Sequence, residues 1–93
     1  MASTIMRSTV LFGGRVQGVG FRYTVMNIAQ SYDVVGYVRN MPDGKVELVA
    51  EGETSELNSL VEEVKHRMQG FIDDVTAAES PATGEFKRFG IQH

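Results

Sequence analysis

Residues 34–51 read VVGYVRNMPDGKVELVAE, and this stretch decides how the rest of the chain can fold. The tetrapeptide MPDG, at residues 41–44, separates two runs that are rich in strand-favouring residues. Proline presets φ, aspartate bonds its own backbone, and glycine takes the positive φ that a hairpin turn needs. In the second run two sets of side chains alternate: Val46, Leu48 and Ala50 alternate with Glu47, Val49 and Glu51. The pattern predicts a β-hairpin with strands at residues 34–40 and 45–51.

The segment before the hairpin predicts a strand followed by a helix. Residues 7–16 alternate between two faces, and Ser8, Val10 and Phe12 share one of them. From residue 21 the period changes to that of a helix, with an apolar stripe formed by Phe21, Val25, Ile28, Ala29 and Tyr32. We expect Asp33 to close this helix.

The segment after the hairpin predicts a helix followed by a strand, which is the reverse of the order before the hairpin. Thr54 or Ser55 is expected to cap a second helix, and Gly70 to stop it. The apolar stripe of this helix consists of Leu57, Leu60, Val61, Val64 and Met68. Residues 71–79 predict a fourth strand, residues 80–84 a loop, and residues 86–91 a short final strand.

The predicted order is β-α-β-β-α-β with a short extra strand, which is typical of the split β-α-β arrangement. We therefore expect an α+β, ferredoxin-like sandwich in which two helices cover one face of an antiparallel sheet. The chain has 93 residues, enough for one domain with one modest core. We expect residues 1–93 to form that single domain.

Composition excludes several classes of protein. The net charge is −3 and the pI is near 5.3, which argues against a protein that binds nucleic acid by general attraction to phosphate. There is no cysteine and no apolar run long enough to span a membrane, and residues 1–8 lack an apolar core of the secretory type. We expect a cytoplasmic protein. Two histidines, His66 and His93, are too few and too scattered for a metal site.

The junction between the first strand and the first helix carries the clearest chemical signal. Residues 17–22 read QGVGFR, directly before and into the predicted helix. Free N–H groups and the helix dipole favour an anion at such an N-terminus. Gly18 and Gly20 allow successive N–H groups to converge, and the guanidinium of Arg22 suits a phosphate. The stretch predicts a cup for an anion of the phosphate type; the alternative is a plain glycine-rich turn beside a surface arginine.

Two better-known phosphate motifs do not fit this junction. A Walker loop needs Lys and Ser or Thr after its second glycine, where this chain has Val19 and Gly20. A dinucleotide-binding loop needs a third glycine at the position of Tyr23. Neither ATP nor NAD is therefore implied.

Two stretches resemble the signatures of one family. Residues 14–22, GRVQGVGFR, resemble the pattern G-x-V-Q-G-V-x-F-R, and residues 36–47, GYVRNMPDGKVE, resemble G-[YFW]-V-x-N-x-x-D-G-x-V-E. Both patterns are those of the acylphosphatase family, and the similarity extends over essentially the whole chain. The chain departs from the family after Met68, where the usual Gly-Pro pair is missing, and in residues 89–93, which lack the usual aromatic or basic ending.

The resemblance implies hydrolysis of an acyl phosphate, a carboxyl-phosphate mixed anhydride, to a carboxylate and inorganic phosphate. It implies no metal and no cofactor, and it makes Arg22 and Asn40 the catalytic residues. Asn40 would hold the attacking water by its amide. The phosphate-binding residues would be Gln17, Gly18, Val19, Gly20, Phe21 and Arg22, mainly through their backbone N–H groups. The leaving carboxylate is a weak base, so oriented donors suffice and no strong general acid is needed.

The same resemblance sets the expected partners. We expect a small-molecule acyl phosphate as substrate and inorganic phosphate or sulfate as a product-like ligand. We expect no nucleic-acid partner, no membrane partner and a monomer.

Other functions remain open from the sequence. A domain of this fold could bind RNA by stacking bases on aromatic residues of its central strands, but residues 45–51 contain no aromatic residue and two acidic ones. A catalytically silent module that binds phosphate is the second alternative. Single residues also have structural interpretations: Asn40 as a strand-end residue, and Arg15 and Arg39 as solvated strand-edge charges.

Overall fold

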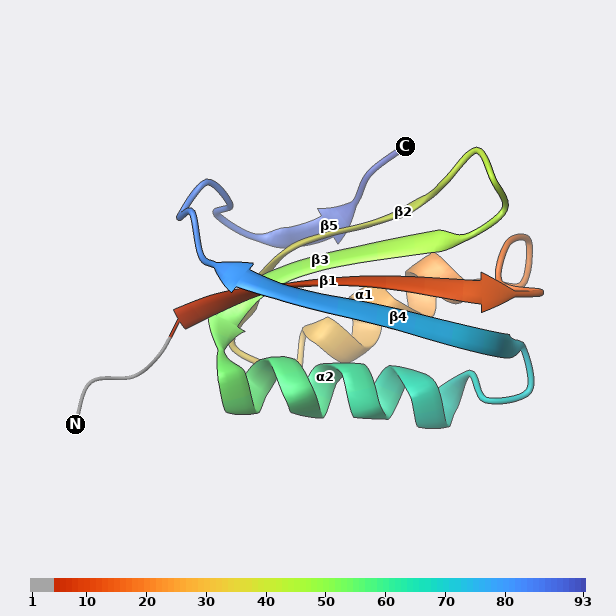
Figure 1. Ribbon diagram of the computed structural model, residues 1–93, viewed down its shortest axis with the longest axis horizontal. Helices are drawn as coiled ribbons and strands as arrows, with labels where there is room; N and C mark the ends of the chain where they lie inside the picture. The colour runs from red at the N-terminus through yellow and green to blue at the C-terminus, as the bar shows by residue number, and fades with distance from the viewer. Residues whose placement is uncertain (1–4) are drawn as a thin grey trace.

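The computed structural model describes residues 5–93, in which five strands and two helices alternate (Figure 1). The strands are β1 (Ile5–Gly14), β2 (Val34–Asn40), β3 (Val46–Glu53), β4 (Ile72–Pro81) and β5 (Phe89–Ile91), and the helices are α1 (Phe21–Ala29) and α2 (Thr54–Arg67). Residues 1–4 lie outside the described residues; they belong to the N-terminal stretch on which the expected cytoplasmic location partly rests. Neither α1 nor α2 has the length and apolar character needed to cross a bilayer.

The strands form one sheet in the order β4-β1-β3-β2-β5. β1 pairs antiparallel with both β3 and β4, and β2 pairs antiparallel with β3. Both helices cover the same face of this sheet (Figure 1). The predicted α+β, ferredoxin-like split β-α-β arrangement with a short extra strand is confirmed, but the sheet is mixed and not wholly antiparallel.

The departure from the predicted antiparallel sheet is the extra strand β5, which pairs parallel with β2. Pro81 pairs with Met6, Met6 with Gly52, and Gly52 with Val34, so these residues form one row across the sheet. β4 therefore ends level with the start of β2. The chain crosses from one edge to the other at this end of the sheet (Figure 1), and β5 consequently runs in the same direction as β2.

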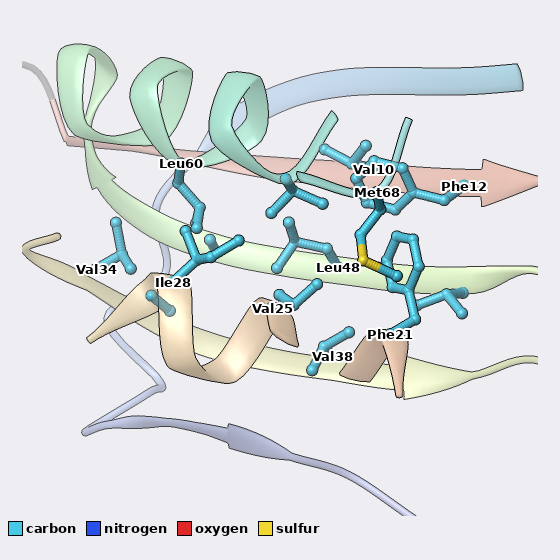
Figure 2. Packing of buried hydrophobic residues seen from close by; sticks show 14 of the residues in the cluster. Val10, Phe12, Phe21, Val25, Ile28, Val34, Val38, Leu48, Leu60 and Met68 are labelled. Carbon is cyan, nitrogen blue, oxygen red and sulfur yellow. The ribbon is translucent and has the colours of Figure 1, made fainter. Parts of the chain in front are cut away.

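The core lies between the sheet and the helices. Figure 2 shows side chains of both helices meeting those of the three central strands, β1, β3 and β2. The buried residues labelled there are Val10, Phe12, Phe21, Val25, Ile28, Val34, Val38, Leu48, Leu60 and Met68. Each such side chain contributes roughly 1.5–3 kcal/mol by leaving water, so this layer is what holds the helices in place.

α1 ends earlier than predicted. It stops at Ala29, and the N–H groups of Ser31 and Tyr32 donate to the carbonyls of Ile28 and Ala29 at 3.0 and 3.1 Å. These bonds are those of a tighter turn, which brings the chain into β2 sooner than a continued helix would. Tyr32 still packs against the core, as its place in the apolar stripe predicted.

The predicted ends of α2 are wrong in detail. Neither Thr54 nor Ser55 is the cap: the N-cap is Glu53, which has extended backbone angles (φ −65°, ψ 145°), because β3 runs directly into the helix. At the other end, Met68 is the C-cap with φ −110° and ψ 20°. Gly70 lies beyond it without a positive φ, so it is not the stop. The helix passes instead into a tighter turn at Met68, whose carbonyl accepts from the N–H of Phe71 at 2.9 Å.

The opposite face of the sheet is covered by the chain between β4 and β5. Glu51 of β3 is only 3% exposed, and it accepts hydrogen bonds from the N–H groups of Thr83 and Gly84, each at 3.0 Å. Arg7 Nε donates to the same carboxylate at 2.8 Å, and its guanidinium lies 5.0 Å from the centre of the Phe86 ring. Residues 86–88, predicted as strand, are therefore part of a cover, and only Phe89–Ile91 pairs with β2.

These contacts set the ionisation of Glu51. Burial alone would raise the pKa of the carboxyl, but the backbone N–H of Thr83, the Arg7 guanidinium and the N–H of Gly84 outweigh it and lower the pKa from 4.5 to about 2. The charged form thus stabilises the fold above the ordinary pKa, and this contribution is lost as the pH falls towards 2.

We predict that Glu51→Gln lowers the free energy of unfolding at pH 7 by about 1–3 kcal/mol, the cost of a weakened buried hydrogen-bond set. Urea unfolding of both proteins at pH 7 and near pH 2 measures this difference. The two stabilities should converge in acid. A difference that stays constant with pH would show that Glu51 acts through its shape and not through its charge.

Candidate active site

The connection from β1 to α1 turns at two glycines. Gly18 and Gly20 both have a φ of 78°, in the left-handed region. A Cβ at either position would meet no atom within 4 Å, so the backbone angle and not crowding favours glycine here. Gly20 is the N-cap of α1, which has no side-chain cap and no acidic residue in its first turn. The first N–H groups of α1 are therefore available to an anion.

Core packing fixes this loop at both ends. Val16 and Phe21 are 1% and 2% exposed, and the Phe21 ring lies 5.1 Å from the ring of Phe12 in β1 (Figure 2). A Cβ on Gly14 would come within 2.4 Å of the carbonyl oxygen of Phe71, so the loop starts directly against the connection between α2 and β4. The loop is thus short, anchored and shaped by its glycines.

Arg22 lies in the first turn of α1, beside these N–H groups, and it is half-buried. Among residues 5–93 it has no ion-pair partner, whereas acidic side chains pair with Arg7, Arg39, Lys45, Lys65 and Arg67. The charge of Arg22 is therefore not compensated by a carboxylate. A free guanidinium of this kind can hold two oxygens of a phosphoryl group at once.

Asn40 is the last residue of β2 and pairs with Val46 of β3. Its Oδ1 atom is buried and has no hydrogen-bond partner in the described part of the chain. A buried acceptor that stays unpaired costs about 1–3 kcal/mol, so this oxygen marks a place where a further donor fits. Because Asn40 lies at a strand end, its backbone is held by the sheet.

Gln17 joins the loop to the turn that follows Asn40. Its Nε2 donates to the carbonyl oxygens of Met41 and Lys45, at 2.9 and 3.0 Å. From the sequence, only the backbone of Gln17 was expected to belong to the site. No pattern in the sequence could have revealed these side-chain bonds, because the acceptors are backbone atoms 24 and 28 residues away.

The predicted site residues thus lie at one end of the sheet, where Figure 1 shows the β1–α1 loop and the β2–β3 turn together. Arg39 takes a different position. Its Nε donates to Glu47 at 2.7 Å, and its guanidinium lies 5.7 Å from the centre of the Tyr37 ring. This ion pair fits the structural interpretation of Arg39.

A cavity lies elsewhere on the molecule. About 450 Å³ in volume, it opens between α2 and the β1–β4 part of the sheet, and its apolar lining is Val10, Val61, Val75 and Ala77. None of the predicted site residues lines it. Within residues 5–93, no three His, Asp or Glu side chains are grouped so that they could hold a metal ion.

The fold and the site together define a class: a small α+β domain of the split β-α-β type, with its β1–α1 loop and the end of β2 joined at one end of the sheet. The sequence profile of the acylphosphatase family matches residues 8–91. An acylphosphatase of Marinobacter nauticus is 43% identical over 91 residues, which are 97% of this chain and 99% of that relative.

Solved structures agree with the sequence matches. The crystal structure of acylphosphatase from Bacillus subtilis has a TM-score of 0.84 and 36% identity, covering 95% of this chain and 99% of that one. The structure of an acylphosphatase from Coxiella burnetii has a TM-score of 0.83 and 30% identity, with 96% and 94% covered. The chain belongs to the acylphosphatase family, and it is an enzyme of that family.

Proposed function

We propose that this enzyme hydrolyses small acyl phosphates without a metal, and that Arg22 and Asn40 are its catalytic residues. The observation that carries the proposal is the guanidinium of Arg22, which has no ion-pair partner within residues 5–93, beside the N-terminus of α1, which has no side-chain cap. Gln17 links this loop directly to the turn after Asn40. These contacts support a site in which an anion cup lies beside the strand end that carries a buried acceptor for water.

In the proposed mechanism, the cup holds the phosphoryl group. The backbone N–H groups of Gln17, Gly18, Val19, Gly20, Phe21 and Arg22, together with the Arg22 guanidinium, bind its oxygens. These donors are fixed before the substrate arrives, so they stabilise the charge of the transition state without having to reorganise. Phosphoryl transfer depends mostly on such positioning and electrostatics.

Asn40 positions the nucleophile in this scheme. Its buried Oδ1 accepts a hydrogen bond from a water molecule and aims the water oxygen at phosphorus. The water oxygen bonds to phosphorus as the bond to the acyl oxygen breaks. The carboxylate leaves with the electron pair, and the proton of the water passes to the phosphate product or to solvent. Since the carboxylate is a weak base, the scheme needs no general acid.

We propose a monomer with residues 1–93 as one domain, inorganic phosphate or sulfate as a product-like ligand, and no nucleic-acid or membrane partner. A cytoplasmic location is consistent with a chain that contains no cysteine. Nothing in the geometry favours the catalytically silent module.

Release of phosphate from acetyl phosphate and benzoyl phosphate tests the function. We expect turnover of both by the purified protein, and the same rates in the presence of EDTA. Absence of turnover would contradict the function. Loss of activity in EDTA with recovery on addition of a divalent cation would contradict the metal-free mechanism alone.

Arg22→Lys keeps the positive charge and removes the planar pair of donors. We expect near-complete loss of turnover, and loss of phosphate affinity by at least about tenfold, the effect of roughly 1.4 kcal/mol. The inhibition constant for phosphate and the shift in Tm on adding phosphate measure this affinity. Arg67→Lys, which replaces an arginine paired with Glu63 on α2, is the matched control. Near-normal activity of the Arg22 variant would show that charge alone is sufficient.

Asn40→Ala removes the amide that orients the water and leaves the cup intact. We expect kcat to fall by about two to three orders of magnitude, the scale for one preorganised group, with little change in the inhibition constant for phosphate. Asn40→Asp should also weaken binding, because a carboxylate would face an anionic substrate. If Asn40→Ala loses phosphate affinity and keeps its kcat, Asn40 is a ligand of the phosphoryl group and not of the water.

A further inference from the structure

The side chain of Gln17 spans a gap that the sheet does not close. β1 and β2 are not neighbours, because β3 lies between them. The pairing of β3 with its two neighbours ends at one row, in which Val46 lies opposite both Phe12 of β1 and Asn40 of β2. Beyond this row β1 continues beside β4 to Gly14, whereas the β2–β3 turn leaves the sheet. The turn is then held by the Gln17 bonds and by the ion pair of Lys45 with Asp74 of β4, at 3.6 Å.

The amide of Gln17 supplies such a contact with both of its donors. The accepting carbonyls, those of Met41 and Lys45, are the two ends of the turn, and they lie 2.9 and 3.0 Å from Nε2. The turn is rigid by itself, because Met41 N donates to Lys45 O at 2.8 Å and Gly44 N donates to Met41 O at 3.1 Å. Gln17 therefore holds the whole turn from Met41 to Lys45, and Met41 directly follows Asn40.

We infer that Gln17 is a positioning residue: its side chain holds the β2–β3 turn against the β1–α1 loop and thereby orients the Asn40 side chain relative to the anion cup. The inference rests on the proposed function, since it assigns Gln17 a role through Asn40. It adds a side-chain role to a residue whose backbone alone was expected in the cup. The cup itself does not depend on this side chain, because Val16 and Phe21 anchor the loop in the core.

Because the Gln17 side chain acts on the turn and not on the cup, its loss should change one kinetic constant and not the other. Without the Gln17 bonds, the turn can shift relative to the cup and displace the side chain of Asn40 directly before it, while the pairing with Val46 still holds the backbone of Asn40 and the cup keeps its own geometry. A misplacement of about 1 Å at a reacting centre can cost about 100-fold in rate. We therefore expect an effect on kcat and not on the affinity for phosphate.

The test is a double-mutant cycle between Gln17→Met and Asn40→Ala. Methionine matches glutamine in length and has no donor. In the otherwise unchanged enzyme we expect Gln17→Met to lower kcat by about 10- to 100-fold, with a phosphate inhibition constant within about twofold of the parent. In the Asn40→Ala background the same change should cost less than about threefold, because the residue through which Gln17 acts is gone. Equal losses in both backgrounds, or a loss confined to phosphate affinity, would overturn the inference.

Gln30→Met is the matched control. Gln30 lies at the other end of α1, and its Nε2 makes a single long bond of 3.4 Å to Met26 O. We expect this variant to keep the parent kcat, and circular dichroism to show that all variants fold. A similar loss in both glutamine variants would show a general effect of the substitution and would overturn the positioning role.

A readout without turnover separates this inference from the proposed function. In ¹⁵N NMR spectra, Gln17→Met should move the resonances of the Asn40 side-chain amide and of the Gly44 N–H, whereas Gln30→Met should not. If the parent enzyme hydrolyses no acyl phosphate but these resonances move, the function fails and the structural link stands. If the parent is active and the resonances stay in place, the positioning role fails.

Discussion

The burial of Val16 and Phe21 is the constraint on which the site depends. These two side chains hold the ends of the β1–α1 loop in the core, and the contact between the Phe12 and Phe21 rings ties the start of α1 to β1. Between these anchors the backbone turns sharply, because Gly18 and Gly20 adopt left-handed angles. Packing therefore sets the shape of the loop, and within residues 5–93 no hydrogen bond occupies the N–H groups of residues 17–20, which leaves them available to a ligand. Core packing of Val16 and Phe21 thus determines how the β1–α1 loop presents its N–H groups at the surface.

A protein with a net charge of −3 can still hold an anion, because local charge decides at short distance. Charges farther apart than a Debye length of about 8 Å at physiological ionic strength are largely screened. A guanidinium about 4 Å from a phosphoryl oxygen gains roughly 4 kcal/mol at an effective dielectric constant of about 20. Five of the nine basic side chains, Arg7, Arg39, Lys45, Lys65 and Arg67, are compensated by ion pairs. Among residues 5–93 Arg22 has no such partner, and its charge beside the helix N-terminus favours an anion there in spite of the negative net charge.

The features that local sequence specifies were predictable, and those that depend on distant contacts were not. β2 has its predicted bounds, because alternation and the turn at residues 41–44 agree there. The candidate site residues Arg22 and Asn40 were identified from two short stretches, and the fold brings those stretches to the same end of the sheet. The side-chain bonds of Gln17 and the burial of Glu51 could not be predicted, because each depends on a segment more than 20 residues away. The parallel direction of β5 likewise depends on where β4 ends, which is a property of the whole sheet.

The central claim is that the β1–α1 loop and the end of β2 form one phosphate site. Titration of ¹⁵N-labelled protein with inorganic phosphate, followed residue by residue by NMR, tests this claim most directly. The account predicts saturable shifts that are largest for the backbone N–H groups of residues 18–22, with a smaller response of the Asn40 side chain. Residues that line the cavity between α2 and β4, such as Val61 and Ala77, should not respond. Largest shifts at that cavity, or no saturable shift at residues 18–22, would contradict the account.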